Sequence, residues 1–128
     1  MGRRIVLSTP DVARLRAILG SRQGSSLRDR SHIEDLQGEV ERASVVAVDD
    51  LAADVVTLRS QVRVRDMQTG ESRQYTVVSP LQADLASGHI SVLAPLGTAL
   101  LGYREGDEVY WQMPGGPRRL QIEKVMQP

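Results

Sequence analysis

The C-terminal part of the chain carries a dense series of helix and turn signals. Residues 89–93 form an apolar stretch that predicts a strand, and Pro95 fits the first turn of a short helix directly after it. Gly102 can adopt the left-handed conformation that ends a helix, and Gly106 begins a Gly-Asp turn. Strands are expected on both sides of the Pro-Gly-Gly-Pro turn at 114–117. Few folds contain these elements in this order with such short connections.

Two more strands are expected before this block. Val62 and Val64 alternate with Arg63 and Arg65, so the valines are predicted to face a core and the arginines to face solvent. After a Thr-Gly turn, residues 75–78 return as a partner strand. A short helix laid across a twisted antiparallel sheet is an α+β arrangement, which is the fold class that the sequence predicts.

The N-terminal part of the chain predicts a pair of helices. Apolar residues recur at spacings of three and four over 10–20 and again over 27–44. Ser8 or Thr9 can cap the first helix, and Glu39 is expected among the solvated positions of the second. A short polar turn joins the two segments. This pattern predicts an antiparallel helical hairpin, or short coiled coil.

The signals change from helix to strand near residue 48. We therefore expect two domains, a short helical hairpin at 1–48 and a twisted antiparallel sheet domain with one short helix at 49–128. A total of 128 residues fits one small domain with such an appendage.

The composition argues against several functional classes. Sixteen basic residues balance sixteen acidic ones, so free nucleic acid is not expected as a strong ligand, because that affinity comes chiefly from neutralising phosphates. The chain has no Cys, so disulfides and thiolate chemistry are excluded. No apolar window approaches the roughly 20 residues of a membrane span, and no signal-peptide pattern is found. A soluble cytoplasmic protein without a membrane partner is expected.

The residue order of the C-terminal block is similar to that of a known family. Ile-Ser-Val at 90–92, Pro95, Ala-Leu-Leu-Gly at 99–102, a Gly-Asp-x-Val turn and Pro-Gly-Gly resemble the C-terminal domain of the GreA/GreB transcript-cleavage factors. The resemblance covers 58–125 and implies an FKBP-like domain that docks at the rim of the RNA polymerase secondary channel. Within this family, the segment 54–58 and the continuation after Pro95 are closer to the Rnk group, whose name means regulator of nucleoside diphosphate kinase.

The resemblance implies that residues at the start of the short helix contact the polymerase. The candidate docking residues are Leu93, Ala94, Pro95 and Leu96. Gre factors usually carry an acid and a serine directly before the proline, and Leu93 and Ala94 depart from that pattern. The polar contacts of the family are therefore not transferred to this chain. The alternative, that Pro95 only begins a helix, has equal weight.

Gre factors also carry an acidic pair at the tip of a long hairpin, and this pair is assigned to a catalytic magnesium ion. The candidate tip residues of this chain are Gln23, Ser25, Arg28 and Asp29. Asp29 is the only acid in the tip segment and lies between two arginines, which would repel a cation. The first arm would be about 16 Å long. We therefore predict that the protein has no transcript-cleavage activity and needs no metal or other cofactor.

These observations leave three alternative hypotheses for the function. The first is a polymerase-binding transcription regulator of the Rnk type, which occupies the secondary channel without catalysis and affects nucleoside diphosphate kinase indirectly. The alternative is a direct protein-binding modulator of nucleoside diphosphate kinase with no polymerase role. The third, a prolyl isomerase, rests on fold likeness alone. Three Tyr and one Trp in the whole chain leave few aromatic residues for an isomerase pocket.

Overall fold

The computed structural model describes residues 5–21, 30–113 and 116–128. Contacts within the chain divide it into two compact units, Met1–Leu51 and Ala52–Pro128, and each unit is described by itself. Among the described residues, no helix combines the length and the apolar character that a membrane crossing requires.

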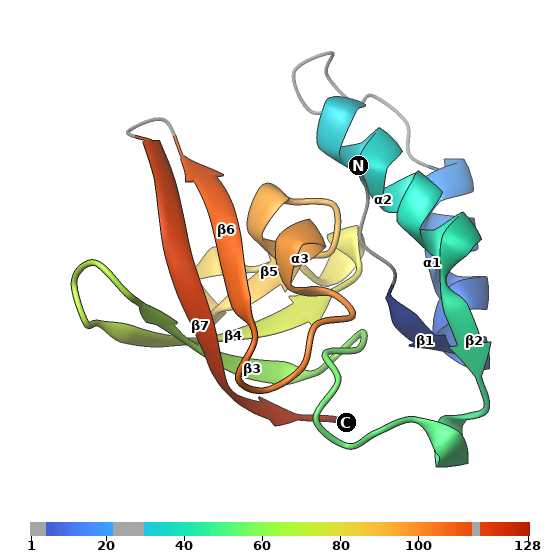
Figure 1. Cartoon of the computed structure of the whole chain (residues 1–128). Helices are drawn as coiled ribbons and strands as arrows, with labels where there is room; N and C mark the ends of the chain where they lie inside the picture. Colours follow the sequence, from blue (N-terminus) through green and yellow to red (C-terminus); the bar gives the residue numbers. More distant parts are fainter. Residues whose placement is uncertain (1–4, 22–29, 114–115) are drawn as a thin grey trace. The chain divides into compact units, whose positions relative to one another are not determined.

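The smaller unit is a pair of helices with two short strands at its base (Figure 1). Its elements are β1 (Val6–Ser8), α1 (Thr9–Ser21), α2 (Arg30–Arg42), β2 (Ser44–Val46) and the 3-10 turn η2 (Val48–Asp50). β1 and β2 pair in parallel, and the Ser44 N–H donates a 2.9 Å hydrogen bond to the Ile5 carbonyl oxygen. The helix predicted over 27–44 is wrong at its C-terminal end, because the chain leaves α2 after Arg42 to form β2.

The apolar faces of α1 and α2 pack together, as the spacing of their apolar residues predicts. Leu15 and Leu19 of α1 are buried, and so are Leu36 and Val40 of α2. Burying side chains of this size stabilises a fold by about 1.5–3 kcal/mol each, before the entropy of ordering them is counted. The hairpin therefore depends on this seam more than on helix propensity.

The predictions for two polar residues of the hairpin can be compared with the structure. Ser8 caps α1, because its Oγ accepts a 3.3 Å hydrogen bond from the Asp11 N–H. Glu39 was expected to be solvated, and this prediction is wrong, since the residue is only 5% exposed. It follows Leu36 by three positions, which places it beside the apolar face of α2 and not opposite it.

The larger unit is a twisted five-stranded sheet with one short helix against one face (Figure 1). Its strands lie in the order β5-β4-β3-β7-β6. They are β3 (Gln61–Asp66), β4 (Ser72–Val78), β5 (His89–Ser91), β6 (Glu108–Met113) and β7 (Gly116–Met126), and helix α3 spans Pro95–Leu100. This arrangement confirms the predicted α+β fold class. The sheet is not wholly antiparallel, because β4 and β5 pair in parallel.

The core of the larger unit lies between α3 and the sheet. Val62 and Val64 of β3 are buried, and the arginines that alternate with them are exposed, which confirms the predicted alternation. Leu96 and Leu100 of α3 are buried, as is Ile122 of β7. The helix therefore contributes one apolar side to a core built mainly from aliphatic residues.

The predicted turns that follow α3 are also confirmed. Gly102 and Gly106 have positive φ angles of 83° and 89°, in the region that favours glycine. β6 and β7 pair as far as Met113 and Gly116, on either side of residues 114–115, which lie outside the described residues.

Helix α3 approaches the end of β5 so closely that only glycine fits at position 97. A Cβ on Gly97 would overlap the Ser91 carbonyl oxygen and would lie 3.1 Å from the Val92 Cα. The Thr98 hydroxyl donates a 2.7 Å hydrogen bond to the Val92 carbonyl oxygen. These two contacts fix the start of α3 against the strand.

We expect Gly97→Ala to lower the free energy of unfolding by about 1–3 kcal/mol, the usual effect of adding atoms to a filled site. Gly20→Ala is the control, because no atom lies within 4 Å of a Cβ there. Gly20 belongs to α1, where alanine favours the helix by up to about 1 kcal/mol. Urea unfolding of both variants measures the difference. A Gly97→Ala protein as stable as the wild type would contradict the close contact.

Candidate functional site

The predicted docking residues lie in the turn between β5 and α3. Leu93 and Ala94 are half-buried, and Pro95 is exposed at the first position of the helix. Leu96 is only 5% exposed and packs into the core. The surface of this turn therefore consists of Leu93, Ala94 and Pro95.

Hydrogen bonds hold this turn in one conformation. The Leu93 N–H donates to the Ser91 Oγ, and the Ala94 N–H donates to the Ser91 carbonyl oxygen, both at 3.0 Å. The Val92 N–H donates a 2.8 Å bond to the Val78 carbonyl oxygen and so ties the turn to β4. A turn held by its own hydrogen bonds presents a preformed surface, which lowers the entropy lost on binding.

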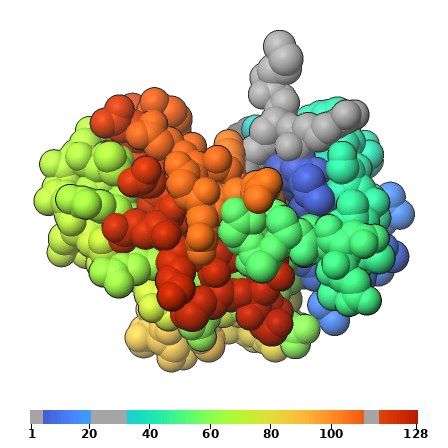
Figure 2. Space-filling view, turned by 60° about the horizontal axis from the view of Figure 1, so that its bottom comes forward, coloured from blue at the N-terminus to red at the C-terminus, as the bar shows by residue number. Residues whose placement is uncertain are grey.

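Two exposed leucines lie in the connection from β4 to β5, which contains the 3-10 turns η3 (Pro80–Gln82) and η4 (Leu85–Ser87). Leu81 is 99% exposed and Leu85 is 81% exposed. In the space-filling view, the yellow and light-orange stretch that leads from β4 to α3 lies along the lower edge of the larger unit (Figure 2). Sequence patterns predict only an irregular loop here. Two leucines in a polar loop are the signal that could have identified this surface.

The candidate tip residues Gln23, Ser25, Arg28 and Asp29 lie outside the described residues. The arms that carry the tip are short, because α1 and α2 have 13 residues each, and 13 residues span about 20 Å in an α-helix. Over 5–21, 30–113 and 116–128, no three His, Asp or Glu side chains cluster in a way that could hold a metal ion.

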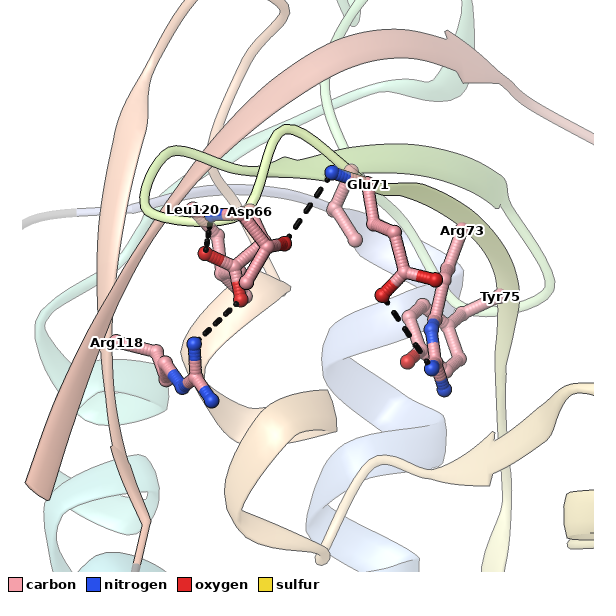
Figure 3. A pocket seen from close by; sticks show the side chains of 8 residues that line it. Asp66, Glu71, Arg73, Tyr75, Arg118 and Leu120 are labelled. Atoms are coloured by element: carbon pink, nitrogen blue, oxygen red, sulfur yellow. Dashed lines mark hydrogen bonds and ion pairs between the residues drawn. The ribbon is translucent and has the colours of Figure 1, made fainter. Parts of the chain in front are cut away.

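A polar hollow of about 210 Å³ lies on the core-facing side of the sheet, beside the β3–β4 hairpin. Its base contains the buried side chains of Val64 and Leu120. Its other lining residues are Asp66, Thr69, Glu71, Arg73, Tyr75 and Arg118. Figure 3 shows the Asp66–Arg118 ion pair on one side of the hollow and the Glu71–Arg73 pair on the other. None of these residues is a predicted site residue, because β3, β4 and β7 contribute them from distant parts of the sequence.

Asp66 is the most highly bonded carboxylate of this hollow. Its Oδ1 accepts hydrogen bonds from the Gln68 N–H at 2.8 Å and the Thr69 N–H at 3.2 Å. Its Oδ2 accepts a 3.2 Å bond from Arg118 Nη1. The Gln68 N–H has the largest effect and lowers the pKa of Asp66, partial burial opposes it, and the Thr69 N–H and the Arg118 charge lower the pKa further. The carboxylate therefore stays ionised to a pH below its ordinary pKa of 3.8.

Two family models match the chain. Residues 51–127 match the model described as "Transcription elongation factor, GreA/GreB, C-term". Residues 3–46 match the model described as "Rnk N-terminus". The two matches follow one another along the sequence and together cover most of it.

Individual relatives agree with these matches. The "Regulator of nucleoside diphosphate kinase" of Escherichia coli (strain K12) is 41% identical over 81 residues, which are 63% of this chain and 60% of that protein. GreA of Nitratidesulfovibrio vulgaris (strain DSM 19637 / Miyazaki F) is 37% identical over 95 residues, which are 74% of this chain and 59% of that protein. The chain thus spans less than two thirds of the length of either relative.

A solved structure resembles the whole chain. The "Prokaryotic transcription elongation factor GreA/GreB from Nitrosomonas europaea" superposes with a TM-score of 0.82 at 36% identity. The superposition covers 98% of this chain and 99% of that one, so both units have counterparts there.

We expect Asp66→Asn to lower the urea midpoint of unfolding at about pH 7. The pKa of Asp66 is lowered in the folded protein, so the ionised carboxylate stabilises the fold above its unfolded pKa. That contribution is lost as the pH falls through the folded pKa, below 3.8. The midpoints of variant and wild type, measured at about pH 7 and again in acid below pH 3.8, should therefore lie closer together in acid. An equal difference at both pH values would contradict this role, and Asp35→Asn, at an exposed position of α2, should have little effect at either pH.

Proposed function

Because the chain belongs to the GreA/GreB family of transcription elongation factors and has an Rnk-type N-terminus, we propose that it binds RNA polymerase without cleaving the transcript. The β5–α3 turn is the observation that carries this proposal. It lies where the sequence resembles the docking segment of Gre factors. Its backbone is held by hydrogen bonds to Ser91, and its surface is formed by 93–95.

The larger unit is proposed to dock at the rim of the secondary channel through this turn. Leu93, Ala94 and Pro95 would form the centre of the contact. Leu81 and Leu85 would add apolar area, since their side chains are already exposed to water. Each 100 Å² of apolar surface removed from water contributes about 2.5 kcal/mol before the costs of association.

The hairpin is proposed to act by occupying the channel entrance. Its arms of 13 residues are short, and Asp29 is flanked by Arg28 and Arg30, which disfavour a bound cation. A protein with a docking surface and a short hairpin, whose tip carries more basic than acidic residues, would compete with longer-armed Gre factors for the same channel. Competition of this kind changes transcription without any chemistry of its own.

The name of the Escherichia coli relative introduces nucleoside diphosphate kinase as a second candidate partner. We propose that any effect on this kinase is indirect and results from altered transcription. The alternative is direct modulation of the kinase with no polymerase role. Mixing the two purified proteins distinguishes these cases, because only direct modulation requires that they bind each other.

We expect Leu93→Arg to weaken binding to core RNA polymerase by about tenfold or more, which corresponds to about 1.4 kcal/mol. Leu93→Asp should retain binding, because Gre factors usually carry an acid at this position. Both variants place a charge on the same half-buried site, so a shared loss of stability would affect both alike. Titration of the labelled chain with core polymerase measures the affinities.

Tyr110→Arg is the matched control for this experiment. Tyr110 is 69% exposed and alternates with the buried Val109 on β6, so it faces away from the core. We expect its variant to bind polymerase as the wild type does. Wild-type affinity of Leu93→Arg, or an equal loss in Tyr110→Arg, would contradict docking through the β5–α3 turn.

We expect the protein to stimulate no transcript cleavage in a stalled elongation complex. GreA or GreB added to the same complex serves as the positive control. Excess protein should slow the cleavage that the Gre factor stimulates, because both would occupy one channel. Shortened transcripts produced by this protein alone would contradict the proposal.

A further inference from the structure

The polar hollow beside the β3–β4 hairpin shares no lining residue with the proposed docking turn. The docking turn joins β5 to α3, whereas the hollow is built from β3, β4 and β7 and the loop between the first two. In the sheet register, Asp66 lies opposite Leu120 and Val64 lies opposite Arg73. Charged groups are therefore arranged around an apolar base (Figure 3).

Arg118 is held in position by a chain of hydrogen bonds. Its Nη1 donates to Asp66 Oδ2 at 3.2 Å and lies 3.4 Å from Gln68 Oε1. Asp66 is itself fixed by the N–H groups of Gln68 and Thr69. In the part of the chain that the structure describes, the Nε and Nη2 of Arg118 contact no acceptor. The guanidinium is thus oriented in advance and keeps donors for a ligand.

The other side of the hollow carries two further donors. The guanidinium of Arg73 makes a long ion pair of 3.7 Å with Glu71, and both side chains are about two thirds exposed. An exposed pair of this kind contributes little, so Glu71 can move aside for another anion. Tyr75 is half-buried, and among the described residues its hydroxyl has no hydrogen-bond partner.

We propose that this hollow binds the carboxylate of an acidic side chain of a protein partner. The planar guanidinium of Arg118 matches a carboxylate in geometry, and Arg73 and Tyr75 supply additional donors. Val64 and Leu120 contact the methylene groups of the acidic residue or an apolar neighbour. Asp66 takes only Nη1 of Arg118, so Nε and Nη2 remain for the carboxylate of the partner.

The size of the hollow favours a single side chain over a free nucleotide. Its volume of about 210 Å³ is below the roughly 300–1,000 Å³ of typical small-molecule sites. A glutamate side chain inserted from outside needs much less space than a base, a sugar and two phosphates. A preformed Arg118 also reduces the ordering cost for a short peptide.

The test is a nuclear magnetic resonance titration of the ¹⁵N-labelled chain with the peptide acetyl-Leu-Glu-Leu-amide. Shifts should concentrate at the amides of Val64, Gln68 and Leu120. The peptide acetyl-Leu-Gln-Leu-amide, which lacks only the charge, should bind at least about tenfold more weakly, as expected when a charge-assisted contact is lost. Equal binding of the two peptides would overturn the proposal.

Variants at two adjacent arginines provide the matched comparison. Arg118→Gln should weaken binding of the glutamate peptide by about tenfold or more, and Arg118→Lys should lose part of the affinity because it lacks the planar fork. Arg119→Gln removes the same charge from the opposite face of β7, where Arg119 is exposed and lies 4.0 Å from Glu108. It should bind the peptide as the wild type does.

Three further outcomes would refute the carboxylate site. One is an equal loss of affinity in Arg119→Gln and Arg118→Gln, which would indicate a general charge effect. Another is wild-type affinity of Arg118→Lys, which would exclude recognition by the fork. The third is tighter binding of inorganic phosphate or of a nucleoside diphosphate than of the peptide at the same amides. The amide spectrum of each variant reports directly whether it is folded.

Discussion

The larger unit depends on the close approach of α3 to the end of β5. Because Gly97 has no side chain, the helix can begin almost in contact with the strand that precedes it, and the Thr98 hydroxyl then bonds the Val92 carbonyl oxygen. This contact sets the height of α3 above the sheet and directs Leu96 and Leu100 into the core. It also turns the intervening residues outward. One packing constraint therefore places both the core helix and the turn that we propose as the docking surface.

Local signals in the sequence were sufficient for most elements of the fold. The alternation around Val62 and Val64, the start of α3 at Pro95 and the positive φ of Gly102 all follow from residue-level physics. The pairing of strands that are far apart in the sequence is harder to predict from local signals. β2 has only three residues and no alternation to distinguish it from the end of α2, and its partner β1 is 38 residues earlier in the register Val6↔Ser44. The parallel pairing of β4 and β5 likewise depends on how an irregular connection folds back.

The two candidate sites also differ in whether local sequence signals or long-range pairing bring their residues together. The proposed docking turn is contiguous in sequence, so a motif of a few residues is enough to propose it. Only the structure separates the buried Leu96 from the exposed Pro95. The polar hollow combines Asp66 with Arg118, which are 52 residues apart, and only the register of β3 against β7 brings them together. No spacing rule on a single segment predicts such a pair. The burial of Glu39 was also not predictable from the sequence. Helical periodicity indicates which face of a helix is buried, but it does not give the width of the buried stripe.

The parallel pairing of β1 and β2 has a consequence for how this family can diversify. The pairing joins the chain where it enters the helical hairpin to the chain where it leaves, with α1 and α2 forming a closed excursion between them. Whole turns added to or removed from both arms would leave the strand register intact. A change in hairpin length therefore does not disturb the pairing of β1 with β2. The length of the hairpin can change while the paired strands at its base stay the same.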